Sequence, residues 1–267
     1  MLRSMYSGIS GLKNFQTKLD VIGNNIANVN TYGYKKGRVT FKDAMNQTIA
    51  GASAATNLKG GTNSIQVGLG SSLATIDTID TQSSLQTTNR LLDLGIEGDG
   101  YFVVKNGNST YYTRAGNFYL DEKGTLVTAD GYRVQDVAGK DIVVDVNKIK
   151  SFSIETSGVI NGVTEDENNN DVIEEIGQIQ LAKFSNASGL TKAGNNLLQE
   201  SVNSGTPNFG VPGENRGIVA SGKLEMSNVD LSEEFTDMIV AQRGFQANTK
   251  IITTSDEILQ ELVNLKR

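Results

Sequence analysis

The fold is decided by NVDLSEEFTDMIVAQRGFQANTKIITTSDEILQELVNLKR, residues 228–267. Apolar side chains occupy every seventh position of this stretch, namely Leu231, Met238, Phe245, Ile252 and Leu259. This is the spacing of a helix face that packs against another helix. Asn228 or Asp230 can cap the start, because both side chains accept hydrogen bonds from the first amides of a helix. We therefore predict one long helix.

The alternate positions of the same seven-residue pattern are partly polar. They are Phe235, Gln242, Thr249, Asp256 and Val263. Three consecutive polar residues in this series weaken a simple two-stranded coiled coil. The pattern therefore favours a contact that fixes one register or that involves several partners.

The start of the chain also has the pattern of an amphipathic helix, about thirty residues long. Its apolar stripe is Leu2, Met5, Ile9, Leu12, Phe15, Leu19, Ile22, Ile26 and Val29. Gly8, Gly11 and Gly23 weaken this helix in isolation, and they also allow another helix to approach closely. We expect the two terminal helices to be ordered by packing on each other or on neighbouring molecules. A helical hairpin that closes one globular domain is the alternative.

Between these ends the apolar residues alternate with a period of two, and turn residues recur, as in antiparallel β-sheets. Residues 101–105 and 110–114 are predicted to form a hairpin through Asn106-Gly107. Asn161-Gly162 predicts a second hairpin turn. A strand is also expected at 142–146, whereas residues 190–222 are expected to be mostly loop.

The predicted fold class is therefore α+β. Its first part is a discontinuous, coiled-coil-like domain formed by the long N-terminal and C-terminal helices, residues 1–32 and 228–267. Its second part is a central all-β domain, residues 76–227. Residues 33–75 are predicted to link the two, because they contain the small, polar, glycine-rich stretch GASAATNLKGGTNS.

The composition excludes much catalytic chemistry. The 267 residues include no His and no Cys, so Ser-His and Cys-His nucleophiles, imidazole or thiolate metal ligands and disulfides are excluded. The net charge of −6 argues against general binding to nucleic acid or to an anionic membrane. No apolar run is long enough for a transmembrane helix, and the N-terminus lacks the pattern of a secretory signal.

Two motifs have some features of ligand sites but fail the requirements. Gly95, Gly98 and Gly100 precede a predicted strand, whereas a dinucleotide fingerprint opens a helix. The acidic run 165–171 lacks the glycine and the final glutamate of a calcium loop, which favours an exposed hairpin tip. No pair of carboxylates stands out either. We therefore predict no enzyme, no catalytic or metal-binding residue and no cofactor.

Three stretches carry a family resemblance: LDVIGNNIANVNTYGYKK at 19–36, LDLGIEGDGYFVV at 92–104 with YYTRAGNFYLDEKGTLVTADGYRVQ at 111–135, and the C-terminal stretch from 227. Together they resemble the bacterial flagellar rod and hook axial proteins. SNVDLS, MIVAQR and ILQELVNLKR are most similar to the hook protein, here in a short form. The chain length and TQSSLQTTNRLLDLGI are shared with the distal rod protein. The resemblance favours the hook, with the distal rod subunit of the basal body as the alternative.

The resemblance implies self-assembly into a tubular homopolymer. The terminal helices would line a central channel, the linker would bridge subunits, and the β domain would form the outer wall. Gln242, Thr249 and Asp256 would then lie at subunit junctions or toward the channel. The implied packing residues are Leu2, Met5, Ile9, Leu12, Leu19, Ile22, Ile26, Leu231, Phe235, Met238, Phe245, Ile252, Leu259 and Val263.

The resemblance also implies partners and a location. The partners are the distal rod protein, the hook cap and hook-filament junction proteins, and the flagellar type III export apparatus; neither nucleic acid nor membrane insertion is expected. The location is extracellular, in the hook and basal body, reached without a cleaved signal peptide. Phe41 and Met45, which spacing alone places on a short helix, match the export-gate motif of the family, a Phe followed by three residues and an apolar one.

The implied mechanism is mechanical. A hook is a flexible universal joint that transmits torque from motor to filament, and the small polar residues of 51–64 would slide at low cost while the inner helices stay packed. A monomer with protease-sensitive ends outside about 70–227 would favour this assembly. A secreted module whose β domain binds a ligand and a carboxylate-dependent hydrolase are the alternatives from other classes.

Overall fold

The computed structural model describes residues 2–55, 59–145, 149–165 and 171–265. The chain forms two compact units, each discontinuous in sequence. The terminal unit consists of Met1–Ala27, Gly37–Thr78 and Asp230–Arg267, and the β unit consists of Asn28–Lys36 and Ile79–Val229. With two packed terminal helices and central antiparallel sheets, the fold is α+β and discontinuous, as predicted.

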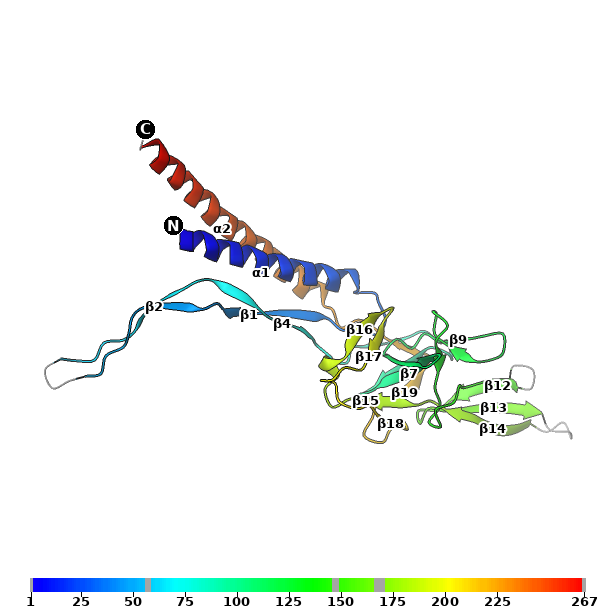
Figure 1. Cartoon of the computed structure of the whole chain (residues 1–267). Helices are drawn as coiled ribbons and strands as arrows, with labels where there is room; N and C mark the ends of the chain where they lie inside the picture. The colour runs from blue at the N-terminus through cyan, green and yellow to red at the C-terminus, as the bar shows by residue number, and fades with distance from the viewer. Residues whose placement is uncertain (1, 56–58, 146–148, 166–170, 266–267) are drawn as a thin grey trace. The chain divides into compact units, whose positions relative to one another are not determined.

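The terminal unit contains both long helices (Figure 1). Helix α1 spans Leu2–Ala27 and helix α2 spans Leu231–Asn264. The predicted cap of α2 is confirmed at Asp230, whose carboxylate accepts a hydrogen bond of 2.8 Å from the Ser232 amide. This bond satisfies one of the amides that have no partner inside the first turn of a helix.

The same unit contains a β-ribbon between residues 37 and 78 (Figure 1). Strand β1 (Gly37–Asp43) pairs with β4 (Ser71–Thr78), and β2 (Asn46–Ala50) pairs with β3 (Ile65–Gly68), both antiparallel. The ribbon lies almost entirely within the segment predicted to be a linker. Short loops join β1 to β2 and β3 to β4, so the two pairs follow one another along the chain.

The short helix predicted at Phe41 and Met45 is wrong. Phe41 lies in β1, and Met45 lies between β1 and β2. The β-branched residues Val39 and Thr40 precede Phe41 and pair with Ile76 and Thr75 across the ribbon. Such cross-strand pairs favour a pleated strand, and they outweigh a helical spacing that rests on two residues alone.

The β unit contains the other strands and one short 3-10 helix, Ala187–Gly189. The strands are β5 (Leu85–Thr87), β6 (Leu94–Glu97), β7 (Tyr101–Asn106), β8 (Ser109–Thr113), β9 (Tyr119–Leu120), β10 (Leu126–Val127), β11 (Arg133–Val134), β12 (Ile149–Ile154), β13 (Val159–Glu165), β14 (Asp171–Gln178), β15 (Leu181–Lys183), β16 (Thr191–Gly194), β17 (Leu197–Gln199), β18 (Asn208–Gly210), β19 (Ile218–Ser221) and β20 (Lys223–Glu225). The main sheet has the order β16-β17-β8-β7-β11-β10-β9, and β15 joins β7 to β18. Smaller sheets are β12-β13-β14, β19-β6 and β20-β5.

One of the two predicted Asn-Gly turns is confirmed and the other is wrong. Strands β7 and β8 form the predicted hairpin, with Gly107 at a φ of 59°. Asn161-Gly162 instead lies inside β13, because the strand turns earlier, at Gly158 with a φ of 78°. A Cβ on Gly162 would lie 2.8 Å from Cδ1 of Ile176, so this glycine makes room for a side chain of the neighbouring strand.

Three other expectations for the β region have different outcomes. Where a strand is predicted at 142–146, Asp141 and Val143 form isolated bridges and Ile142 and Val144 are buried, whereas residue 146 lies outside the described residues. Residues 190–222 are mostly loop, as predicted, although they also contain the short strands β16 to β19. Strands β13 and β14 pair up to Glu165 and Asp171, and the tip predicted between them, residues 166–170, lies outside the described residues.

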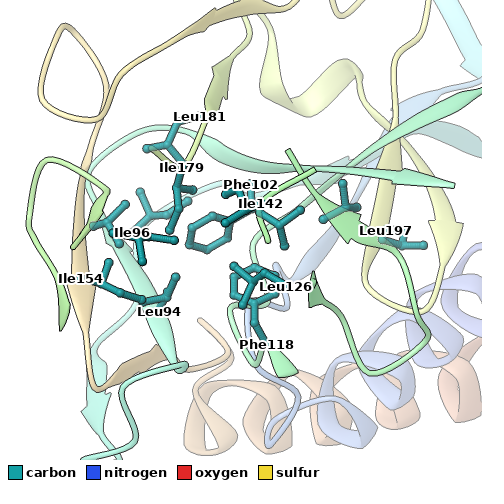
Figure 2. Packing of buried hydrophobic residues seen from close by; sticks show 14 residues of the cluster. Leu94, Ile96, Phe102, Phe118, Leu126, Ile142, Ile154, Ile179, Leu181 and Leu197 are labelled. Carbon is teal, nitrogen blue, oxygen red and sulfur yellow. The ribbon is translucent and has the colours of Figure 1, made fainter. Parts of the chain in front are cut away.

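The β unit has a continuous apolar core (Figure 2). The rings of Phe102 and Phe118 meet edge to face at its centre, with centroids 5.1 Å apart, and neither ring is exposed. The surrounding side chains are Leu94, Ile96, Val104, Leu126, Val134, Ile142, Ile154, Ile160, Ile179, Leu181, Leu197 and Val219. In the described part of the chain, neither helix is long and apolar enough to cross a membrane.

Candidate assembly surfaces

Helices α1 and α2 pack closely at glycines. A Cβ on Gly8 would lie 3.3 Å from Cγ1 of Ile252, and a Cβ on Gly244 would lie 2.6 Å from Cζ of Phe15. Because an early residue of α1 meets a late residue of α2, the helices run antiparallel (Figure 1). The predicted close approach at glycine is therefore confirmed at Gly8. By contrast, a Cβ on Gly23 would meet no atom within 4 Å.

The face of α2 that packs on α1 includes a series that the sequence pattern did not single out. Glu234, Ala241 and Ser255 are buried, and Asn248 is partly buried. This series escapes a search for large apolar residues, although its small and polar members also recur every seven residues. The series could have been identified from small residues that recur at a regular spacing in α2, because the glycines of α1 allow a close approach to such residues.

The polar positions Gln242, Thr249 and Asp256 are all exposed in the single chain. Each follows a member of the series 234–241–248–255 by one residue, which turns it about 100° away around the helix. The structure therefore leaves these three residues outside the helix pair. Their place at subunit junctions or toward a channel stays a prediction.

Polar contacts fix the register of the helices and the ribbon. Asn25, 1 % exposed, donates from Nδ2 to Oε2 of Glu234 at 3.2 Å and to the carbonyl oxygen of Gly37 at 2.9 Å. Its Oδ1 accepts a hydrogen bond from the Gly37 amide at 2.9 Å. One buried amide thus connects α1, α2 and β1, and sliding any of them would leave a buried polar group without its partner.

The predicted packing residues divide into buried and exposed groups. Ile22 is buried, and the partly buried ones are Met5, Leu12, Leu19, Ile26, Met238, Ile252 and Leu259. The exposed ones are Ile9, Leu231, Phe235, Phe245 and Val263. The side chain of Leu2 lies outside the described part. Their contacts with other subunits stay a prediction, but the exposed group has the chemistry for them.

Helix α2 exposes more apolar side chains than the seven-residue pattern predicts. The further ones are Ile239, Val240, Ile251, Ile258 and Leu262, and Leu265 is exposed directly after the end of the helix. An amphipathic helix needs only one apolar stripe to pack on a single partner. Apolar groups exposed on a helix that already packs on α1 indicate a surface for additional partners.

The β-ribbon is the second candidate surface. Every residue of β2 and β3 is exposed, including Ile49 at 62 % and Ile65 at 58 %. The ring of Phe41 lies 6.3 Å from that of Phe15 in α1, whereas Met45 is 81 % exposed. A two-stranded ribbon with both faces in water is marginal on its own. This part of the ribbon therefore has the composition and exposure of a segment stabilised by a neighbour.

A group of charged side chains in the β unit is held by hydrogen bonds. At a shallow hollow of the β unit, Lys183 lies 2.9 Å from Asp99, and its hydrogen bond and positive charge lower the pKa of that carboxyl. Arg216 donates to the backbone oxygens of Asn208 and Phe209 there. Within the described ranges, no three His, Cys, Asp or Glu residues cluster as ligands of a metal ion.

Three stretches of the chain match known protein families. Residues 5–35 match "Flagella basal body rod protein", residues 95–162 match "Flagellar hook protein FlgE/F/G D1 domain", and residues 220–265 match "Flagellar basal body rod FlgEFG protein C-terminal". The first match covers α1 from residue 5 onward, the last contains α2, and the middle one begins in β6 and ends in β13.

The relatives of this chain include both rod and hook proteins. The chain is 62 % identical over 269 residues to the flagellar basal-body rod protein FlgG of Bacillus subtilis, covering 100 % of both chains. It is 40 % identical over 278 residues to FlgG of Borreliella burgdorferi, again with 100 % of both covered. The flagellar hook protein FlgE of that organism is 31 % identical over 445 residues, with 100 % of both covered. These similarities favour the rod over the hook, against the expectation from SNVDLS, MIVAQR and the C-terminal ten residues.

Proposed function

This chain belongs to the family of flagellar rod and hook proteins, and we propose that within it the chain is a subunit of the distal rod of the basal body. Its place is the axial structure of the bacterial flagellum, and its role there is structural. The observation that carries the choice of rod is the 62 % identity to a rod protein of nearly the same length. Alignment with the hook protein extends over 445 residues, so it requires long insertions relative to this chain.

The exposed apolar residues of α2 support assembly as the function. In a polymer, each α2 would pack on its own α1 and on helices of neighbouring subunits, with Phe235, Ile239 and Val263 among the buried side chains. Burial of apolar area at such contacts drives association. Interlocking side chains also resist sliding, which suits a shaft that passes torque without bending.

The ribbon supplies a contact between subunits at a different level of the tube. Met45, Ile49 and Ile65 would be buried against a neighbouring copy, and the pairing of β2 with β3 would then be stabilised by that contact. In this proposal residues 33–75 bridge subunits as a paired ribbon, which is stiffer than the freely sliding segment expected for a hook. Deletion of residues 51–63 tests the bridge, and unchanged rod assembly and motility would refute it.

Phe41 and Met45 are proposed to act in export, before the chain folds. Phe41 is part of β1 in the folded terminal unit, with its neighbours paired to β4, so an export receptor could read the pair as a linear motif only in the unfolded chain. Phe41→Ala with Met45→Ala should abolish secretion while leaving the intracellular amount unchanged. Normal secretion of the double variant would refute the assignment.

Electron microscopy of basal bodies from a deletion strain tests the proposed location. We expect loss of the distal part of the rod, and with it of the hook that is built on it. A complete straight rod that lacks only the curved hook would show that this chain is the hook subunit instead. Expression of the wild-type chain from a plasmid should restore the missing segment.

A further inference from the structure

The β unit contains a buried cluster of charges that joins segments far apart in sequence. The side chain of Glu225, in β20, is fully buried. Its Oε1 accepts a hydrogen bond from Nζ of Lys35 at 2.8 Å, and its Oε2 accepts one from Nε of Arg114 at 2.6 Å. The side chains of Lys35 and Arg114 are only 7 % and 5 % exposed. All three residues belong to the β unit.

The other polar atoms of the cluster also have partners. Arg114 donates from its two terminal nitrogens to the carbonyl oxygens of Gly98 and Gly100. Lys35 also donates to the carbonyl oxygen of Thr81 at 2.7 Å. The Ser83 amide donates to Oε1 of Glu225 at 3.1 Å. This set of bonds compensates for removing three charged groups from water.

Two flanks of the β unit meet at this cluster. The first flank, residues 33–36, leads from α1 into β1, and the second, residues 223–228, leads from β20 into α2. The Gly33 amide donates to the carbonyl oxygen of Glu225 at 2.8 Å. The Lys36 amide donates to Oδ1 of Asn228 at 2.7 Å. Both connections to the terminal helices are therefore held beside one another by the β unit.

A buried ion cluster is a costly way to obtain stability. Apolar residues of similar volume often stabilise a fold as well or better, but removal of one ionic partner leaves an uncompensated buried charge. Glu225 is the one carboxylate that accepts from both Lys35 and Arg114. Release of residues 223–228 would take Glu225 away from Arg114 and leave Lys35 with the more distant carboxylate of Asp80, at 3.8 Å. Release of residues 33–36 would take from Glu225 one of its two cations, so the binding of each flank depends on the other.

We propose that Glu225, Lys35 and Arg114 form a two-flank clamp, which makes the β unit hold or release residues 33–36 and 223–228 together. The clamp fixes both points from which the chain leaves for the terminal helices. It does so with contacts inside the β unit alone, and it applies equally to a rod or a hook subunit.

Hydrogen exchange of the full-length monomer, read by mass spectrometry, tests the coupling. The reporter of the second flank is the Met226 amide, which bonds to the carbonyl oxygen of Ser84 and to no atom of the first flank. Lys35→Met should increase exchange at Met226 by about tenfold or more, although Lys35 lies in the other flank. Glu225→Gln should increase exchange in both flanks by about a hundredfold or more, because it removes the carboxylate that Arg114 contacts and leaves Lys35 with the more distant Asp80, at 3.8 Å. Exchange in strands β7 and β8 should change little.

A matched control is Lys183→Met, which removes an exposed ion pair with Asp99 in the same unit. It should leave exchange in both flanks unchanged. The clamp is refuted if Lys35→Met affects residues 33–36 alone, or if every variant raises exchange uniformly through the β unit. If Glu225→Gln does not fold, Glu225→Asp keeps the charge with a shorter reach, and it must again loosen both flanks together.

Discussion

The two units of this chain bury their apolar residues to very different degrees. Among the buried hydrophobic side chains of the described residues, Ile22 and Ala241 belong to the terminal unit and the rest to the β unit (Figure 2). Helix α2 spans 34 residues yet has one buried hydrophobic side chain. A helix in a protein obtains most of its stability from packing an apolar face. The β unit thus has its own apolar core, whereas α2 leaves apolar side chains exposed, which supports the proposed packing of the terminal unit on further subunits.

The two units also use glycine differently. In the β unit, Gly107, Gly124 and Gly158 have positive φ angles and form the turns between strands. In the helices, Gly8 and Gly244 have ordinary helical conformations but leave space for Ile252 and Phe15. The two helices therefore approach each other closely at these glycines, although few of their apolar side chains are fully buried. Assembly is expected to change the exposed side of α2 and to leave this inner contact as it is.

The largest expected effect of a substitution is in the core of the β unit. Phe118→Ala removes a ring with no exposed surface that packs on Phe102, and it should lower the free energy of unfolding by about 3–5 kcal/mol. Phe235→Ala, at a ring 50 % exposed in α2, should lower it by less than about 1 kcal/mol. Chemical denaturation of the monomer measures both. Equal losses would contradict the contrast between the units.

In a polymerisation assay the substitution of the α2 ring should have a large effect, although it has a small effect on the stability of the monomer. Phe235→Ala should fold normally and yet fail to form rods, because it removes an apolar side chain that the proposal places in contacts between subunits. Sedimentation of purified protein under polymerising conditions measures rod formation separately from folding of the monomer. Normal polymerisation of Phe235→Ala would remove this residue from the proposed interface.

An intermediate effect is expected where the helices touch. Gly244→Ala should destabilise the helix pair by about 1–3 kcal/mol, because the added methyl overlaps the Phe15 ring. The gain of about 1 kcal/mol in helix propensity is not sufficient to offset a rigid ring. Gly23→Ala is the matched control, since its methyl meets no atom within 4 Å, and it should increase helicity. Far-ultraviolet circular dichroism during thermal unfolding measures both, and a gain in both variants would exclude a close contact at Gly244.

The features that the sequence predicts correctly are those set by residues close together along the chain. Local signals predicted the Asp230 cap, both helices and the hairpin at Asn106-Gly107. They failed at Asn161-Gly162, where the glycine is required by Ile176 of a neighbouring strand, and at Phe41, where pairing with β4 decides the conformation. Contacts distant in sequence cannot be read from the spacing of neighbours along the chain.

The candidate surfaces were predicted only in part for the same reason. The seven-residue spacing identified Met238 and Ile252, which are partly buried, but it could not show that Phe235 and Val263 are left exposed. The cluster of Lys35, Arg114 and Glu225 was not predictable, because isolated charges in a sequence carry no sign of burial. A charged residue is usually at the surface, so only the structure identifies these three as exceptions.

A smaller effect, which depends on pH, is expected from Glu225. Burial raises the pKa of its carboxyl, but the charges and hydrogen bonds of Arg114 and Lys35 together outweigh burial, so the pKa lies below its ordinary value. A lowered pKa in the folded state adds stability above the ordinary glutamate pKa of about 4.3, and this stability is lost as the pH falls through the folded pKa. The β unit should therefore become easier to denature in acid. Glu225→Gln should be less stable at neutral pH and should lose less on acidification, and an unchanged pH profile would contradict this origin.

The smallest effect on the monomer is expected at Thr249, and it gives the most specific test of the exposed side of α2. Thr249 and Thr236 are both exposed, and each hydroxyl donates to the backbone oxygen four residues earlier, at 3.0 and 2.8 Å. Either Thr→Ala change should alter monomer stability by less than about 0.5 kcal/mol. Because the two threonines point to different sides of the helix, a contact at the polar series predicts that only Thr249→Ala changes the dissociation temperature of assembled rods. The same shift from both variants would indicate a change in the helix itself, and no shift from Thr249→Ala would place that residue away from subunit junctions.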